Sequence, residues 1–306
     1  MLTVNADYEK VNSAGGTAIA IGNFDGIHKG HQKMLKTLKS VAYELGVPSL
    51  VYTFSEHPVN ILCKEKFKGA IYNNEKKERL IDDVGIHTLF FEDFLKVSNL
   101  TPEEFVKEIL VDKFNISAAV IGENGKFGKN GSGNAEILKE FGKKYGFSVH
   151  VVDSLTIDGQ VCSSTRIRDM IASGNVFAAE KFLGRPYSIS GEVTGNKHLG
   201  KTYGYPTANL IPDESSIKIK NGVYGTNVIV DRKSYKAITN VGTTSFDDEK
   251  TERTESHILD FEADIYGKTI EVEFLYYMRD FKSFLSTDEL KIQLDEDKKM
   301  RKLGGN

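Results

Sequence analysis

The stretch GNFDGIHKGHQ, residues 22–32, decides the fold of the first half of the chain. The segment TAIAIGNF (17–24) leads into it with the apolar pattern of a strand, and the segment after it has helical periodicity. The apolar positions at that spacing are Met34, Leu35, Leu38, Val41, Ala42 and Leu45. A strand, a glycine-containing turn and a helix are typical of a parallel α/β sheet, in which ligands bind at the carboxyl ends of the strands.

The rest of the first half continues this alternation. Strands are predicted at 48–54, 86–91, 116–122 and 147–153, with helical patterns between them. One helix has a clear start in TPEE (101–104), where Thr101 is the expected N-cap, Pro102 the first helical residue and Glu104 the capping glutamate. The pattern predicts a Rossmann-like α/β domain with helices on both faces of the sheet.

The pattern changes after FLGRPYS (182–188). Strands are predicted at 187–194, 222–230, 234–241, 256–266 and 269–278 with little helix between them, which indicates a small antiparallel β-barrel. The final stretch, 286–302, is predicted to be an amphipathic helix with Leu290, Ile292 and Leu294 as its apolar positions before Met300.

The chain has 306 residues, enough for two domains, and a net charge of −3 with a pI near 6.2. This charge argues against a general nucleic-acid binder. Two cysteines, Cys63 and Cys162, are too few for a disulfide framework, and no apolar run reaches the ~18 residues of a membrane span. We therefore expect a cytoplasmic protein with small-molecule partners, and no oligomeric state is predicted.

The two histidines of the opening stretch, His28 and His31, are spaced to share a helical face. Gly26 and Gly30 lack side chains, so backbone or ligand can come close. Helix N-terminal N–H groups and two imidazoles together favour a cradle for phosphate oxygens. A metal-binding pair and a surface pair without a role are the alternatives, but no further zinc-type ligand spacing follows.

A second cluster, SSTRIRDM (163–170), follows the last strand of the first half. Its hydroxyl residues can cap a helix whose first turn carries Arg166 and Arg168. Cations there oppose the helix dipole, and a bound anion would remove the conflict. The alternative is a capped helix with two solvated arginines.

The stretch GNKHLGKT (195–202) fits the phosphate-loop pattern G-x-x-x-x-G-K-[ST] letter for letter. That motif requires a helix directly after it, whereas Gly204, Pro206 and Asn209 follow here. We therefore reject a P-loop.

Taken in order, GNFDGIHKGHQ, TFSEHP, SSTRIR, FLGRPY, GKTYGYPTAN and ESHILDF resemble the bacterial riboflavin kinase/FAD synthetase family, within the nucleotidylyltransferase superfamily. The resemblance implies an FMN adenylyltransferase domain over residues 1–184 and a riboflavin kinase-like barrel over 185–306. The first would transfer AMP from ATP to FMN, giving FAD and pyrophosphate. The second would phosphorylate riboflavin with ATP and Mg²⁺.

The resemblance also implies residue roles in the first domain. His28 and His31 would hold ATP phosphates, Arg168 would neutralise pyrophosphate, and Ser164 and Thr165 would order its loop. Further residues on the ATP side are Gly22, Asn23, Phe24, Asp25 and Gly30. On the flavin side they are Phe54, His57, Pro58, Asn124 and Phe127, and core packing is the alternative for Phe54 and Phe127. The chain departs from the family at Glu56, usually proline, and at Asn124-Gly125, usually Asp-Phe.

In the second domain the resemblance makes Thr207 and Asn209 the residues for Mg²⁺ and ATP phosphate, Gly200 and Lys201 part of the nucleotide loop, and Glu255 the base for the ribityl hydroxyl. Arg279 would lie on the flavin side. The departures here are NVGTTSF (240–246), which lacks the family's proline, Phe281 in place of an acid, and Lys220-Asn221 in place of proline before the G-V-Y element.

Three alternatives follow from these departures. The chain could be a FAD synthetase with a degenerate kinase domain, a flavin or nucleotide sensor without turnover, or an adenylyltransferase for another phosphate-bearing acceptor.

Overall fold

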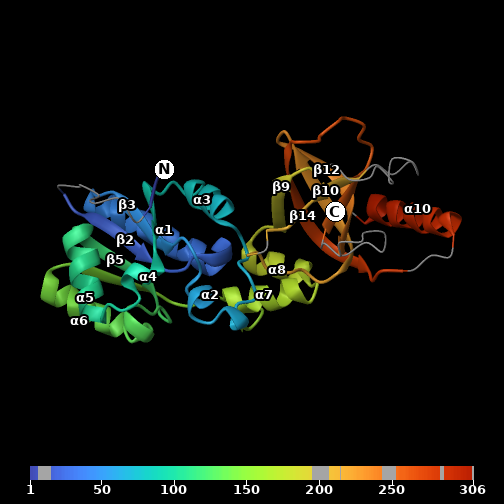
Figure 1. The fold of residues 1–306 in the computed structure, drawn as a ribbon. Helices are drawn as coiled ribbons and strands as arrows, with labels where there is room; N and C mark the ends of the chain where they lie inside the picture. Colours follow the sequence, from blue (N-terminus) through green and yellow to red (C-terminus); the bar gives the residue numbers. More distant parts are fainter. Residues whose placement is uncertain (6–14, 195–206, 214, 243–252, 283–285, 305–306) are drawn as a thin grey trace. The chain divides into compact units, whose positions relative to one another are not determined.

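A six-stranded parallel sheet organises the first part of the chain in the computed structural model, which describes residues 1–5, 15–194, 207–213, 215–242, 253–282 and 286–304 (Figure 1). Its strands, in the spatial order β1-β4-β3-β2-β5-β6, are β1 (Leu2–Asn5), β4 (Thr88–Glu92), β3 (Ser49–Phe54), β2 (Thr17–Ile21), β5 (Ile116–Gly122) and β6 (Ser148–Val152). All neighbouring strands are parallel. The predicted Rossmann-like sheet is therefore confirmed, and β1 is a strand that sequence patterns missed.

Two apolar layers cover the faces of this sheet. Helices α1 (Lys29–Leu45) and α3 (Asn74–Asp82) contribute to one layer, where Leu35 and Ile81 pack against Val51. The π-helical segment η3 (Phe105–Lys113) and α6 (Ala135–Tyr145) contribute to the other layer, where Leu110 and Leu138 lie. The short elements between them are η1 (Asp25–Ile27), α2 (Pro58–Leu62), η2 (Lys64–Lys66), α4 (Phe94–Val97), α5 (Pro102–Glu104), η4 (Lys129–Gly131), β7 (Thr156–Ile157) and β8 (Gln160–Val161).

The predicted helix start at Thr101 is confirmed as a capping box. The Thr101 hydroxyl accepts the Glu104 N–H, and the Glu104 carboxylate accepts the Thr101 N–H at 2.7 Å. Two orphan N–H groups are satisfied reciprocally, which is why the helix begins at this point.

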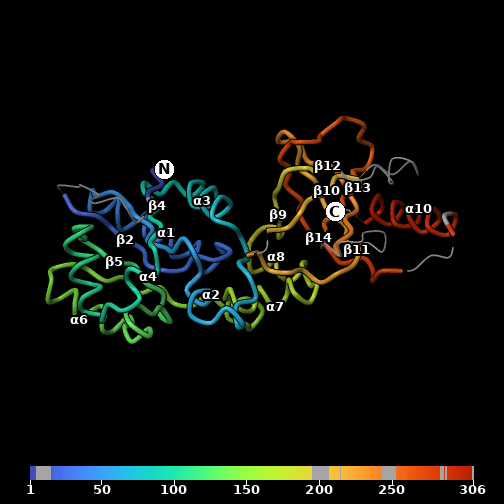
Figure 2. Tube along the Cα trace, in the orientation of Figure 1, coloured from blue at the N-terminus to red at the C-terminus, as the bar shows by residue number. Residues whose placement is uncertain are grey.

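A second, antiparallel sheet organises the rest of the chain, in the order β10-β13-β12-β11-β14-β9 (Figure 2). Its strands are β9 (Tyr187–Glu192), β10 (Ala208–Leu210), β11 (Gly222–Val230), β12 (Lys233–Gly242), β13 (Arg253–Ile258) and β14 (Thr269–Arg279). The edges meet where Thr194, just after β9, donates its N–H to the Asn209 carbonyl at 3.0 Å. The predicted small barrel is confirmed. The strand expected over 256–266 ends at Ile258, because Asp260 turns the backbone into the left-handed region.

The described residues form two compact units, Met1–Ser164 and Thr165–Asn306. Helices α7 (Ser164–Ala172) and α8 (Val176–Leu183) lead into the second, where α8 contacts β14. In the described part of the chain we find no helix with the length and apolar character needed to cross a bilayer.

The C-terminal helix α10 (Thr287–Leu303) is present as predicted, but the face that it buries is polar. Gln293, Asp297 and Arg301 are its buried residues, whereas Ile292 is 63% exposed. Their spacing of four places them on one helical face. Asp297 binds Arg279 of β14, and Arg301 donates to the Thr226 and Ala237 carbonyls, so hydrogen bonds replace apolar contacts. Of the apolar positions named from the sequence, Leu290 and Leu294 are half-buried and Ile292 is exposed.

Candidate active site

The turn between β2 and α1 has an uncommon backbone. Phe24, Gly26 and Ile27 have φ values of 46°, 81° and 39°. The left-handed region is unfavourable for a β-branched residue such as Ile27, so surrounding contacts must hold the turn. A Cβ on Gly26 would lie 2.9 Å from the Ile71 side chain, which explains glycine there.

His28 ends this turn and caps α1. Its Nδ1 accepts the His31 N–H at 3.2 Å, and the two imidazole rings stack with their centroids 3.7 Å apart. Because Nδ1 is the acceptor, the proton of a neutral His28 is on Nε2, which makes Nε2–H the donor. A Cβ at Gly30 would lie 3.0 Å from the His28 ring, so this glycine makes room for the imidazole.

Phe24 and Asp25, two of the residues predicted to bind ATP, have buried side chains that stabilise the turn. Phe24 is fully buried in the apolar layer that contains α1. The Asp25 carboxylate is 2% exposed and accepts the N–H groups of Ile71, at 2.9 Å, and Tyr72, at 3.4 Å. The Ser164 hydroxyl donates to the Asp25 carbonyl at 2.9 Å, which ties the start of α7 to the turn.

Exposure differs among the remaining ATP-side candidates. The side chain of Asn23 is exposed at the carboxyl end of β2, and its carbonyl accepts the Thr53 hydroxyl at 2.9 Å. Gly22 donates its N–H to the Tyr52 carbonyl. On α7, Thr165 is exposed and Arg168 is buried. Their family roles stay predictions.

The flavin-side candidates of the first unit lie on two loops, one after β3 and one after β5. Phe54 is half-buried and lies edge-on to Phe94, with ring centroids 5.4 Å apart. His57 caps α2, whose first residue is Pro58, and stacks on Phe67 with ring centroids 4.8 Å apart. These half-buried rings offer apolar surface beside the carboxyl end of β3.

The second flavin-side loop, 122–128, is more tightly packed. Phe127 is 6% exposed and packs against Phe105, as its core-packing alternative predicts. The amide of Asn124 donates to the Ser154 hydroxyl at 3.0 Å. A Cβ at Gly125 would overlap the Ile121 side chain, so a larger residue at this position requires Ile121 to move.

Glu92, at the carboxyl end of β4, is a buried acid that sequence reasoning missed. It is 2% exposed, lies opposite Phe54 in the sheet register, and accepts the Tyr52 hydroxyl at 3.2 Å. Burial raises the pKa of its carboxyl, and the Lys113 ammonium, 3.9 Å away, opposes that rise. A glutamate ending the apolar run TLFFE was the available signal.

In the second unit, three polar residues stand in one row across three strands. Glu255 on β13 lies directly opposite Asn209 on β10 and Asn240 on β12. Directly opposed residues of antiparallel strands project from the same face with Cβ atoms about 5 Å apart. Asn240 was not predicted, although the family's Asn-Ile-Gly element, matched by NVG (240–242), marked it.

Asn209 also has the features of a ligand for a cation. It is 4% exposed, and within the described residues its Oδ1 has no hydrogen-bond partner. Its Nδ2 lies 3.5 Å from the Thr207 carbonyl. The described segments contain no cluster of three His, Cys, Asp or Glu side chains that could hold a metal. The arrangement fits Mg²⁺, which keeps several waters and uses few protein oxygens beside substrate phosphates.

Arg279, a predicted flavin-side residue, is bound by a carboxylate of the C-terminal helix. Arg279 is engaged by Asp297 of α10, with Nε 3.0 Å from Oδ1 and Nη2 2.6 Å from Oδ2. Its Nη1 donates to the Asp280 carbonyl at 3.1 Å. Gly200 and Lys201, with the stretch 195–202, lie outside the described residues. Beyond that stretch, Ala208–Leu210 is a strand and not the helix that a P-loop needs.

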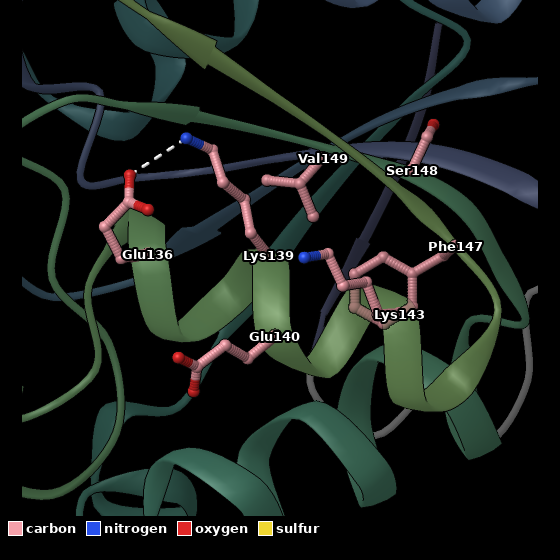
Figure 3. A pocket seen from close by; sticks show the side chains of 7 residues that line it. All are labelled: Glu136, Lys139, Glu140, Lys143, Phe147, Ser148 and Val149. Atoms are coloured by element: carbon pink, nitrogen blue, oxygen red, sulfur yellow. Dashed lines mark hydrogen bonds and ion pairs between the residues drawn. The ribbon is translucent and has the colours of Figure 1, made fainter.

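A hollow of about 400 Å³ lies away from all these residues, between α6 and β6 (Figure 3). It is lined by Glu136, Lys139, Glu140, Lys143 and residues 147–149. Glu136 and Lys139 pair with each other at 2.9 Å. No predicted site residue lines this hollow, so the candidate site is the turn and not the hollow.

Comparison with known proteins gives two family matches. Residues 10–166 match the family model described as FAD synthetase, and residues 183–303 match the one described as riboflavin kinase. Two curated relatives are both bifunctional riboflavin kinase/FMN adenylyltransferases. The one from Buchnera aphidicola (subsp. Schizaphis graminum) is 34% identical, and the alignment covers 94% of this chain and 93% of that relative. The one from Escherichia coli K12 is 30% identical and covers 92% and 90%.

A solved structure shares the fold. It is titled as a macrolide-efflux protein from Streptococcus pneumoniae, is 32% identical, and covers 99% of both chains with a TM-score of 0.89. Both halves of the chain therefore have counterparts in sequence and in structure.

Proposed function

We propose that each of the two domains of this chain catalyses one of two reactions. The chain belongs to the family of bacterial bifunctional riboflavin kinase/FMN adenylyltransferases. The chain is a FAD synthetase with a riboflavin kinase domain, and its substrates are ATP and flavins. We assign adenylyl transfer to residues 1–184, which contain the FAD synthetase match over 10–166, and the kinase step to 185–306, which contain nearly all of the riboflavin kinase match over 183–303.

The observation that carries the adenylyl-transfer assignment is the His28–His31 pair at the start of α1. The positive end of a helix dipole attracts phosphate oxygens, and the cap directs the His28 donor, Nε2–H, away from the helix backbone. Attack of the FMN phosphate on the α-phosphorus of ATP needs no protein nucleophile. The reaction needs alignment of the two phosphate groups and stabilisation of their negative charge. The fixed hydrogen-bond donors of this turn serve both needs.

For the kinase step we assign the base to Glu255 and the phosphate and Mg²⁺ contacts to Asn209 and Thr207. The ribityl hydroxyl must lose its proton as it attacks, and a carboxylate can accept that proton. Asn209 lies directly opposite Glu255, and its buried side-chain oxygen, Oδ1, is suited to a hard cation. When bound, Mg²⁺ supplies positive charge to the ATP phosphates. Since all of these substrates are metabolites of the cell interior, we place the enzyme in the cytoplasm.

A second candidate is a FAD synthetase whose kinase domain is inactive. Two observations favour it: the absence of the family's proline in 240–246, and the pairing of the Arg279 guanidinium with the Asp297 carboxylate. A sensor and an adenylyltransferase for another acceptor are further outcomes of the same test.

The test separates flavins after incubating the pure protein with ATP and Mg²⁺, once with riboflavin and once with FMN. FAD from both substrates is the expected result and establishes both activities. FAD from FMN alone means an inactive kinase domain. No product from either substrate overturns the enzyme assignment; ATP and FMN binding without pyrophosphate release then indicates a sensor, and turnover of another phosphate ester indicates a different acceptor.

A further inference from the structure

Glu92, at the end of β4, is a buried acid beside the flavin-side loop that follows β3. Its side chain is 2% exposed and lies opposite Phe54 in the register of the sheet. The Lys113 ammonium lies 3.9 Å from its Oε2. Next to this carboxylate is a buried apolar layer that contains the rings of Tyr52, Phe90, Phe105 and Phe114. A carboxylate is costly in such surroundings unless it is paired and hydrogen-bonded, so the partners of Glu92 define what it does there.

The two oxygens of this carboxylate bind two different segments of the chain. Oε2 accepts the hydroxyl of Tyr52 on β3 at 3.2 Å, and Oε1 accepts the N–H of Asp93 at 3.0 Å. Asp93 is the N-cap of α4, and Phe94 is the first residue of that helix. One buried side chain therefore connects β3 to the start of α4.

The ring of Phe54 contacts both of these segments. It is edge-on to Tyr52, with ring centroids 5.8 Å apart, and edge-on to Phe94, with ring centroids 5.4 Å apart. The main-chain carbonyl of Glu92 also accepts the N–H of Ser55, the residue after Phe54, at 3.0 Å. Because Phe54 is half-buried, part of its ring is exposed, and the orientation of that part depends on neighbours that Glu92 holds.

We propose that Glu92 is a positioning residue for adenylyl transfer: its side chain fixes Tyr52 and the start of α4, so that Phe54 presents a fixed apolar ring to the isoalloxazine of FMN. The proposal rests on the proposed function of the first domain and adds to it a residue for the flavin. A ring that is already in place loses little conformational freedom when the flavin binds, so holding it raises the affinity for FMN. ATP binding at the turn between β2 and α1 does not use this connection.

The experiment compares Glu92→Leu and Glu92→Gln with the native enzyme and measures FAD formation from FMN, with separate KM values for FMN and ATP. Leucine lacks both acceptors, so Glu92→Leu should raise the KM for FMN about fivefold or more, the scale of one aromatic contact, and leave the KM for ATP nearly unchanged. Glutamine can keep both connections, because its Oε1 can accept the Asp93 N–H while its Nε2–H donates to the Tyr52 hydroxyl. Glu92→Gln should therefore stay within about twofold of the native KM for FMN.

Leu89→Ala is the matched control for a loss of packing. Leu89 is fully buried on the same strand, in the apolar layer on the other face of the sheet. Its truncation leaves a cavity and should lower the Tm, but the KM for FMN should stay native because no flavin-side residue depends on it. Tyr52→Phe is a milder variant that removes one of the two connections of Glu92, and it should raise the KM for FMN less than Glu92→Leu does.

A double-mutant cycle tests whether Glu92 acts through Phe54. In a Phe54→Ala background, adding Glu92→Leu should change the KM for FMN little further, because the ring that Glu92 positions is already gone. Additive effects overturn the proposal, as do equal rises in the two KM values of Glu92→Leu, the same rise in Leu89→Ala, or a Glu92→Gln enzyme as impaired as Glu92→Leu. If the native enzyme makes no FAD, the proposed function has failed; the same variants, compared by FMN affinity from quenching of flavin fluorescence, then decide the role of Glu92.

Discussion

Replacement of His28 separates its observed role as the cap of α1 from its proposed role as a hydrogen-bond donor to the phosphates of ATP. His28→Asn keeps a side-chain acceptor for the His31 N–H, since asparagine is among the best N-cap residues, whereas His28→Ala removes it. Both variants lose the ring and its stack, so the difference between them isolates the cap at about 1 kcal/mol. For a unit of this size that difference corresponds to roughly 2–4 °C in Tm.

Activity should respond differently from stability. Both variants lose the Nε2–H donor, and removing one fixed donor of this kind costs about 10²–10³ in kcat. The assay is FAD formation from FMN, beside thermal unfolding by circular dichroism, with phosphorylation of riboflavin as a control for the other active site. A His28→Asn enzyme within tenfold of native activity would show that His28 does not hold the phosphates. Equal Tm values for the two variants would contradict the cap.

Three further outcomes are expected. Glu255→Gln should abolish phosphorylation of riboflavin and leave FAD formation from FMN intact, because the base is lost in one active site only; loss of both activities would contradict the division of labour. Asp297→Asn should destabilise the barrel by about 3 kcal/mol in denaturant unfolding, since Arg279 loses its buried charged partner, and a change below about 1 kcal/mol would mean that this pair adds little. Phe54→Ala should raise the KM for FMN at least severalfold with a smaller effect on the KM for ATP, because an aromatic contact is worth about 1 kcal/mol beyond its buried area; an unchanged KM for FMN would favour a packing role.

Alternation of strand and helix patterns was enough to predict the parallel sheet. The buried strands β2 to β5 are short, mainly apolar runs; β4 and β5 end at Glu92 and Gly122, and Gly22 and Ser55 follow β2 and β3. The strand β1 escaped because it has four residues and pairs at the edge with β4. The helix predicted at the C-terminus is present as α10, but the sequence pattern could not show that Gln293, Asp297 and Arg301 are its buried residues. An apolar pattern cannot reveal that Asp297 and Arg301 find partners on strands remote in the sequence.

Sequence motifs were enough to identify those candidate site residues that lie within a motif. His28, His31, Asn209 and Glu255 lie in recognisable stretches of sequence, and the structure adds the register that places Glu255 directly opposite Asn209. The contacts of Glu92 could not be predicted, because a glutamate is normally solvated. Its burial follows from tertiary packing, which brings the hydroxyl of Tyr52 on a neighbouring strand to its carboxylate.

The main-chain and side-chain oxygens of Asn209 differ in their hydrogen bonding. Its main-chain carbonyl accepts both the N–H and the hydroxyl of Thr194 where the edges of the barrel meet, whereas its side-chain oxygen has no hydrogen-bond partner among the residues that the structure describes. Exchanging its side chain leaves the main-chain connection in place. If Asn209 holds Mg²⁺ as we propose, natural variation or laboratory selection can change the metal preference at this position, through aspartate or serine for example, without breaking the connection between the edges of the barrel.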